Sequence, residues 1–142
     1  MKLHIITIGS PKLTYAQTGW KLYIDRLQRY HTVRVTHIAD NRNDSDHIEA
    51  AIGSGYSVAL VINGPQMNSE ALAAFIDKRA NVAQELCFII GGPDGLPKKV
   101  IDSADRQWGL SELTFPHDLA MVILAETLYR ASTISAGQPY HH

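Results

Sequence analysis

The second half of the chain contains Leu86-Cys87-Phe88-Ile89-Ile90-Gly91-Gly92-Pro93-Asp94-Gly95-Leu96, in which five apolar residues lead into a glycine-rich loop. Two similar runs occur earlier, Leu3 to Ile8 before Gly9 and Val58 to Ile62 before Asn63-Gly64. Continuous apolarity is typical of strands in parallel sheets, because helices cover both faces of such sheets. We therefore predict an α/β protein with a parallel sheet flanked by helices.

Three further patterns predict the elements around these strands. Thr32 to Ile38 is rich in β-branched residues and indicates a strand near the edge of the sheet. Apolar residues at helical spacing indicate helices over Leu13 to Tyr30 and over Ala71 to Arg79. The polar sequence from Asp40 to Asp46 indicates a loop.

One apolar sequence in the last third of the chain is unusual. Leu119 to Ala125 contains seven consecutive apolar residues, and the helical pattern continues to Ala131. A helix that is apolar on every side has to be buried on every side. A chain of this size covers only one side of the helix with its own sheet, so the sequence predicts a homodimer whose interface includes Leu119 to Tyr129.

Length and composition indicate a single domain over residues 1–142. The chain is 45% hydrophobic and carries a formal net charge of -1, which excludes nucleic-acid binding through a general basic field. The single cysteine, Cys87, allows no disulfide within the chain and no cysteine-rich metal site. No apolar segment is long enough for a membrane span, so we expect a cytoplasmic protein without a membrane partner.

The seven histidines give no indication of a metal site. None forms a helical pair at i, i+4 spacing or a cluster with cysteine, which are the patterns that favour zinc. We expect His4, His31, His37 and His47 to lie at the surface or to be half-buried, and we expect no metal cofactor.

Three loops are candidates for one ligand site. Asn63-Gly64-Pro65 and Gly91 to Leu96 each follow a predicted strand, and the carboxyl ends of parallel strands share one edge of a sheet. Leu110 to His117 is a non-helical segment before the apolar helix. The glycines allow backbone to approach a ligand closely, although a tight turn explains them equally well. Pro93 breaks the dinucleotide-binding G-x-G-x-x-G pattern and no Walker sequence follows, so a phosphate site is disfavoured.

These motifs closely resemble the bacterial family of large-subunit ribosomal RNA methyltransferases that modify N3 of a pseudouridine. That family belongs to the SPOUT class of S-adenosylmethionine enzymes. Four blocks in order carry the resemblance, and two amino-terminal motifs also fit: Phe88 to Leu96, Leu110 to His117, Leu124 to Ala131, Pro139-Tyr140-His141, then Ile8-Gly9-Ser10 and Gln17-Thr18-Gly19.

The resemblance implies a SPOUT methyltransferase fold with a trefoil knot in its carboxyl-terminal part, and S-adenosylmethionine as the cofactor. It implies that the cofactor is held by Leu60, Gly91, Gly92, Leu110, Ser111, Glu112, Leu113, Thr114, Phe115 and Pro116. Backbone groups satisfy adenine in such loops, which explains why small and apolar residues suffice. Candidate catalytic residues are His117, at the edge of this pocket, and Tyr140 and His141 in the tail, which is expected to close over the target base.

The implied substrate is 23S rRNA within the large subunit or the 70S ribosome. Since the chain has no general basic field, we expect RNA contacts from Arg130, Arg26 and Arg29, combined with recognition of the shape of an assembled ribosome. Two alternatives remain open. One is a knotted methyltransferase that acts on another RNA, and the other is a non-catalytic module that binds S-adenosylmethionine or the ribosome.

Overall fold

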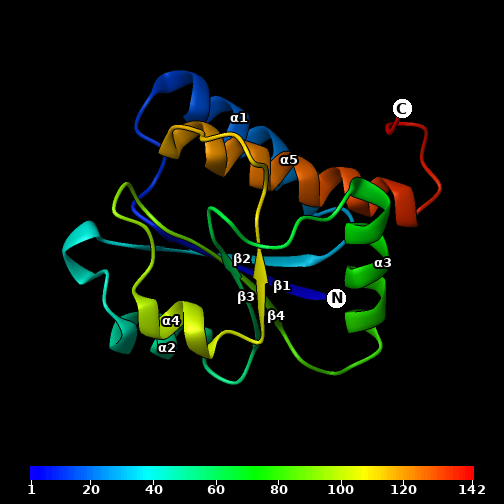
Figure 1. Ribbon diagram of the computed structural model, residues 1–142. Coiled ribbons are helices and arrows are strands. Elements are labelled where there is room, and N and C mark those ends of the chain that lie inside the picture. The colour runs from blue at the N-terminus through cyan, green and yellow to red at the C-terminus, as the bar shows by residue number, and fades with distance from the viewer.

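A computed structural model describes residues 1–142 and contains a parallel sheet with helices on both faces (Figure 1). The five strands lie in the order β2-β1-β4-β3-β5, and every neighbouring pair is parallel. The strands are β1 (Lys2–Ile8), β2 (Thr32–Ile38), β3 (Tyr56–Leu60), β4 (Leu86–Ile90) and β5 (Arg106–Trp108). The predicted fold class is thereby confirmed, and so is the place of Thr32–Ile38 at an edge of the sheet.

The helices form two layers. Three cover one face of the sheet, α1 (Thr14–Leu27), α3 (Ser69–Ala80) and α5 (His117–Ser135), and two shorter ones cover the other, α2 (Ser45–Ile52) and α4 (Lys98–Ser103) (Figure 1). A 3-10 turn, Asp40–Arg42, lies within the predicted loop after β2. The sequence predicted neither α4 nor β5, and no helix has the length and apolarity that a membrane span needs.

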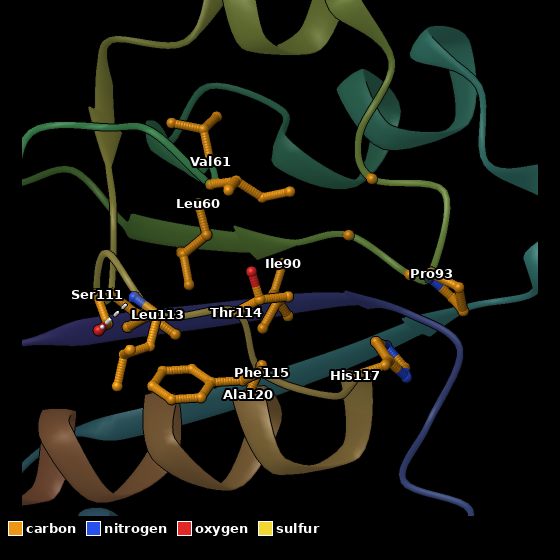
Figure 2. A pocket seen from close by; sticks show the side chains of 15 residues that line it. Leu60, Val61, Ile90, Pro93, Ser111, Leu113, Thr114, Phe115, His117 and Ala120 are labelled. Atoms are coloured by element: carbon orange, nitrogen blue, oxygen red, sulfur yellow. Dashed lines mark hydrogen bonds between the residues drawn. The ribbon is translucent and has the colours of Figure 1, made fainter.

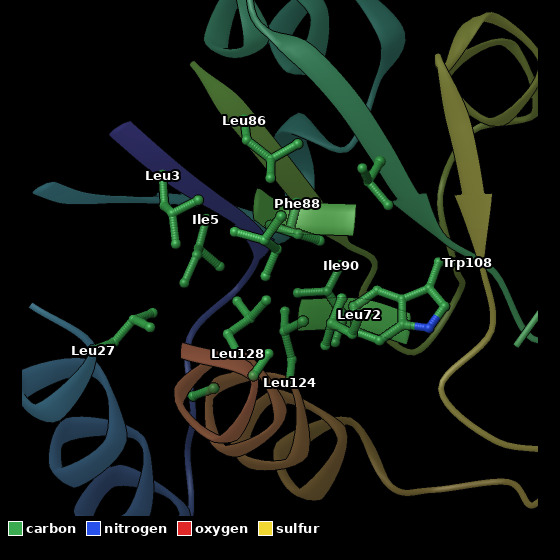
Figure 3. Packing of buried hydrophobic residues seen from close by; sticks show 14 of the residues in the cluster. Leu3, Ile5, Leu27, Leu72, Leu86, Phe88, Ile90, Trp108, Leu124 and Leu128 are labelled. Carbon is green, nitrogen blue, oxygen red and sulfur yellow. The ribbon is translucent and has the colours of Figure 1, made fainter. Parts of the chain in front are cut away.

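The main hydrophobic core lies between the sheet and the layer of α1, α3 and α5 (Figure 3). Helix α5 buries one side completely, with Met121, Leu124, Ala125 and Leu128 all at 0% exposure. On its other side, Leu119, Val122 and Ile123 are only half-buried. Within one chain, therefore, the first turns of the apolar helix are covered on one side and only partly covered on the other.

Helix α5 is tied to α1 by Asp118 in its first turn. The Asp118 carboxylate is largely buried, and its Oδ2 accepts the backbone N–H groups of Lys12 (2.9 Å) and Leu13 (2.6 Å). These amides precede α1 and have no acceptor of their own within the helix. Further along, α1 and α5 approach closely at Gly19, where an added Cβ would lie 3.1 Å from a methyl of Val122.

The expected exposure of the histidines is wrong for one of them. His37 and His47 are exposed and His31 is half-buried, but His4 has no exposed surface. His4 lies on β1 between two neighbouring strands, and its Nε2 is 2.7 Å from Thr36 Oγ1 on β2. This hydrogen bond makes a buried imidazole acceptable, and the one-dimensional pattern of β1 does not reveal it.

His31 links the segment after α1 to α5, and its protonation makes the free energy of unfolding depend on pH. Its Nε2 is 2.9 Å from Ser132 Oγ, and burial, together with the charged amino terminus, lowers the pKa of His31 to about 4. The unfolded chain takes up this proton near the ordinary pKa of 6.5, whereas the folded protein does not. Stability from this group is therefore present above the unfolded pKa and is lost as the pH falls below it.

We expect the free energy of unfolding to fall by about 1–2 kcal/mol between pH 7 and pH 5 through His31 alone. Urea denaturation of the wild type and of His31→Gln at both pH values measures this contribution. The glutamine amide can still hydrogen-bond Ser132 but does not titrate. Burial also lowers the pKa of His4 and His37, and both proteins share that background. Equal pH dependence of the two proteins would contradict the prediction.

Candidate active site

A cavity of about 240 Å³ lies at the carboxyl edge of the sheet (Figure 2). The ends of β3 and β4, the segments after β4 and β5 and the first turn of α5 form its walls. Two of the three candidate loops, Gly91 to Leu96 and Leu110 to His117, therefore share one site, whereas Asn63-Gly64-Pro65 lies outside the lining and only the residues just before it, Leu60 to Ile62, contribute. Its lining consists of Leu60, Val61, Ile62, Ile90, Gly91, Gly92, Pro93, Gly95, Leu110, Ser111, Leu113, Thr114, Phe115, His117 and Ala120. None of these residues is Lys, Arg, Asp or Glu, so the cavity is apolar and uncharged.

Most of the residues expected to hold a cofactor line this cavity. Leu60, both glycines of the Gly91-Gly92 pair and the residues of Leu110–Phe115 other than Glu112 do so. Glu112 and Pro116 are exposed and lie outside the lining, and Pro116 precedes the first residue of α5. The sequence missed Val61, Ile62, Ile90, Pro93, Gly95 and Ala120 as lining residues. In the sequence, the only indication that these residues line the cavity was their position next to residues recognised from the family motifs.

Close contacts between backbone segments shape the cavity. A Cβ at Gly91 would lie 2.7 Å from the carbonyl carbon of Gly95, whereas a Cβ at Gly92 would meet Ile8 at an ordinary 3.4 Å. The loops after β3 and β5 also touch, because a Cβ at Gly109 would lie 2.5 Å from the carbonyl oxygen of Gly64. The glycine that tolerates no side chain in the β4 loop is therefore Gly91.

Asn43 supports the β4 loop from outside the cavity. Its side-chain amide donates to the carbonyl oxygen of Gly95 at 3.0 Å, and Gly95 has a positive φ of 74°. Asn43 belongs to the polar segment after β2. The segment that follows β2 thus holds the conformation of the cavity loop that follows β4.

His117 is the one ionisable side chain in the lining. It is 12% exposed, its Nδ1 lies 3.7 Å from Asp118 Oδ1, and its buried Nε2 has no hydrogen-bond partner within the chain. A proton on Nδ1, facing the carboxylate, leaves a lone pair on Nε2. His117 therefore offers an unused acceptor at a cavity whose other side chains are mostly apolar.

The tail residues lie at the other end of α5. Tyr140 donates its hydroxyl to Glu126 Oε1 at 3.2 Å, and His141 contacts Arg130 at 3.1 Å and Glu70 of α3 at 2.8 Å. Figure 1 shows the chain turning back after α5, so that the carboxyl terminus lies beside the last turns of this helix. Arg130 follows His117 by thirteen residues, which corresponds to about 20 Å of helix at a rise of roughly 1.5 Å per residue. One chain therefore does not bring His117 together with Tyr140 and His141.

The environment of Tyr140 keeps its phenol protonated. Burial, then hydrogen bonding to Tyr23 and the charge of Glu126, raise the pKa of Tyr140 to about 12. Its ring packs edge-on against Tyr129, with 4.8 Å between the ring centroids. In this arrangement Tyr140 is a hydrogen-bond donor and a stacking surface rather than a base.

The arginines expected to contact RNA lie near this tail. Arg26 lies over the rings of Tyr23 and Tyr129, 5.9 Å and 5.6 Å from their centroids. Arg29 is exposed and takes part in no salt bridge, whereas Arg130 is paired with Glu126 at 2.8 Å. The structure thus groups Arg26 and Arg130 with the tail aromatics and leaves Arg29 free.

One group of potential metal ligands lies elsewhere, in the strands rather than in the loops. The ligand atoms of His4, Glu85 and Cys87 lie within 4.8 Å of one another. Arg34 holds Glu85 at 2.8 Å, and burial raises the pKa of the Cys87 thiol to about 12. A protonated thiol beside an arginine-paired carboxylate is a poor donor set for a metal.

A family model described as "Predicted SPOUT methyltransferase" matches residues 1–141. The chain therefore belongs to the SPOUT methyltransferase family and is a methyltransferase, as the resemblance implied. The knot implied by the resemblance stays a prediction.

Relatives with similar sequences carry one shared name. A protein of Deinococcus deserti named "Ribosomal RNA large subunit methyltransferase H" is 50% identical over 144 residues, with 99% of each chain covered. A protein of Deinococcus radiodurans with the same name is 47% identical over 144 residues, with the same coverage. These matches span nearly the whole of both chains.

Solved structures share the fold at low sequence identity. A probable methylase family protein from Haemophilus influenzae has a TM-score of 0.64 at 9% identity, with 99% of this chain and 70% of that chain covered. A tRNA (m1G37) methyltransferase from Aquifex aeolicus has a TM-score of 0.60 at 12% identity, with 99% and 73% covered. At such identities the likeness shows the fold alone.

The two adjacent glycines of the β4 loop give a matched test of the cavity wall. We expect Gly91→Ala to lower the free energy of unfolding by about 1–3 kcal/mol, because its Cβ overlaps the backbone of Gly95 and a loop has to move. Gly92→Ala has ordinary contact distances and should stay within about 0.5 kcal/mol of the wild type. Urea denaturation measures the free energy of unfolding of both variants. A larger loss for Gly92→Ala than for Gly91→Ala would refute the assignment of Gly91 as the glycine that tolerates no side chain.

Proposed function

We propose that this protein transfers a methyl group from S-adenosylmethionine to N3 of a pseudouridine in 23S rRNA, within the large subunit or the 70S ribosome. The observation that carries the proposal is the uncharged cavity at the carboxyl edge of the sheet, walled by close-packed backbone loops and bordered by His117. The names of the relatives from both Deinococcus species support ribosomal RNA as the substrate class.

The cavity suits the nucleoside and sulfonium parts of S-adenosylmethionine. Its lining offers apolar side chains, the Ser111 and Thr114 hydroxyls and the backbone groups near Gly91, with no cation to hold a phosphate. When bound, the cofactor supplies an activated methyl group on a positively charged sulfur. The residues of this chain then have two tasks, which are to align the target nitrogen and to receive its proton.

His117 is the proposed proton acceptor. In the reaction the methyl–nitrogen bond forms as the methyl–sulfur bond breaks, and the N3 proton leaves to a base. His117 Nε2 is unpartnered at the cavity, whereas Tyr140 is held as a phenol and both nitrogens of His141 are occupied. Tyr140 and His141 therefore act on the target base by stacking.

A second copy of the chain completes the site. The tail contacts α5 at Glu126 and Arg130, which lie roughly 14 Å and 20 Å along the helix from His117 of the same chain. Between them, α1 and α5 present a partly uncovered apolar surface with Leu119, Val122 and Ile123 half-buried and Leu22 43% exposed. We propose a homodimer that packs these helices together and places the tail of one chain at the cavity of the other.

Contact with the ribosome is proposed to use few cations. Arg29 is exposed and unpaired, and Arg26 lies beside the aromatic residues next to the tail. A chain with a formal net charge of -1 does not attract RNA over a distance, so recognition depends on the shape of the assembled particle. We propose that residues 1–142 act as one domain in the cytoplasm, where this substrate is found.

The proposed function predicts a strong preference for assembled substrate. Purified protein with S-adenosylmethionine should methylate ribosomes or large subunits that lack the modification, and mass spectrometry of rRNA fragments should place the methyl on N3 of a pseudouridine. Free 23S rRNA should react at least about tenfold more slowly, because few cations contribute to binding.

Other outcomes would decide against the proposal. A methyl group on a different RNA would favour a knotted methyltransferase of other specificity. Donor binding by calorimetry without methylation of any of these substrates would favour a non-catalytic module.

Mixing two inactive variants tests the shared site. Ala120→Phe should block the cavity, and deletion of Tyr140–His142 should remove the tail while leaving donor affinity within a few-fold of wild type. Each homodimer should lose about two orders of magnitude of activity, the scale of a lost positioning or acid–base group. A mixed dimer pairs one open cavity with one intact tail, so a refolded equal mixture should recover roughly a quarter of wild-type activity if the tail acts across the dimer. An inactive mixture that contains mixed dimers would show that the tail serves its own chain.

A further inference from the structure

Every hydrogen-bonding group of the tail side chains Tyr140 and His141 is held by a charged residue. Glu126 Oε1 accepts the Tyr140 hydroxyl at 3.2 Å and the Arg130 Nε–H at 2.8 Å. The Arg130 guanidinium also lies 4.7 Å from the centroid of the Tyr140 ring. Glu70, in the first turn of α3, holds His141 from the opposite side. We call Glu70, Glu126 and Arg130 the tail clamp.

The tail clamp fixes the protonation pattern of His141. A guanidinium donates hydrogen bonds and accepts none, so His141 Nδ1 accepts from Arg130 Nη1 at 3.1 Å. The Glu70 carboxylate accepts, so His141 Nε2 carries the proton and donates to Oε1 at 2.8 Å. The imidazole is thus held as the neutral Nε2–H tautomer between two charges of opposite sign.

The charged residues of the tail clamp differ in how firmly their side chains are held. Glu126 and Arg130 follow one another at i, i+4 on α5 and are both about one-quarter exposed, so they form a fixed pair. Glu70 is 62% exposed and comes from a different helix, and its contact with His141 spans 71 residues. Glu70 is therefore the only residue of the clamp that ties the tail to an element other than α5.

We propose that Glu70 is a positioning residue for methyl transfer, which fixes the orientation and tautomer of His141 through its contact with Nε2–H. This inference rests on the proposed function of the tail, and it gives Arg130 the task of holding the tail instead of an RNA phosphate. Without Glu70 the His141 ring can flip, so that either ring nitrogen accepts from Arg130 and the proton lies on the other one. Glu70 is not among the residues that line the cavity.

Long-range ¹H–¹⁵N NMR of the histidine rings in the full-length protein reports the tautomer of His141. This measurement tests the tail clamp without requiring methylation activity. The wild type should show His141 as the Nε2–H tautomer, with His141→Gln used to assign its signals. Glu70→Ala should give a mixture of tautomers, and Glu70→Gln, whose amide oxygen can accept the same hydrogen bond, should retain the wild-type pattern. Glu49→Ala, on the opposite face of the sheet, is the control for loss of a carboxylate.

Kinetics on ribosomes then tests the positioning role. Glu70→Ala should lower kcat about tenfold, with unchanged affinity for S-adenosylmethionine, and Glu70→Gln should restore most of the loss. Wild-type tautomer behaviour in Glu70→Ala would overturn the clamp itself. A broken clamp with wild-type kcat would overturn the positioning role and leave the proposed function standing. If the wild type methylates no ribosomal substrate, the positioning role falls together with the proposed function, while NMR still decides whether the clamp exists.

Discussion

The carboxylate of Asp118 joins the segment before α1 to the first turn of α5, which borders the candidate active site. It stands in the first turn of α5 and accepts two backbone N–H groups from the segment that leads into α1. Since the carboxylate is largely withdrawn from water, losing the contact would leave a buried charged group unpaired. The same residue lies beside His117, so the contact that docks α1 on α5 also holds the candidate base at the cavity.

The cavity depends on backbone packing more than on particular side chains. Two loops touch at Gly64 and Gly109, and the β4 loop folds back on itself at Gly91. Such contacts bring amide and carbonyl groups to the cavity without bulky side chains around them, which is the environment that a purine without a phosphate requires.

The sequence predicted the parts of the fold that depend on local pattern. The runs Leu3–Ile8 and Phe88–Ile90 are strands because their apolar residues need cover on both faces, and Leu119–Ala131 is helical for the same reason. The short strand Arg106–Trp108 has no such pattern, since it exists only through its pairing with β3. The short helix Lys98–Ser103 likewise depends on packing against the far face of the sheet, where Val100 is buried.

In the candidate site, too, residues in recognisable local motifs were predictable and contacts that depend on long-range packing were not. Loop residues such as Gly91 and Phe115 were predictable because their motifs resemble those of a known family, and the structure brings them to one cavity. The contact of Glu70 with His141 was not predictable, because the two residues are 71 positions apart and an acidic residue at a helix start has a sufficient local explanation in the helix dipole. Contacts of this kind arise from the packing of α3 beside α5.

The distribution of charge limits how this protein can recognise a large RNA. Among its cations, Lys12, Lys21, Arg34, Lys98 and Arg130 are in salt bridges with carboxylates. Arg26, Arg79 and Arg106 lie over aromatic rings. The cations that remain, Lys2, Arg29, Arg42, Lys78 and Lys99, come from five different segments of the chain rather than from one basic element. Each phosphate contact contributes a salt-dependent increment, so few contacts contribute little to the affinity for RNA. In the proposed homodimer acting on the ribosome, selectivity for one nucleotide comes from the geometry of the particle, which presents the base to two copies of the chain at once.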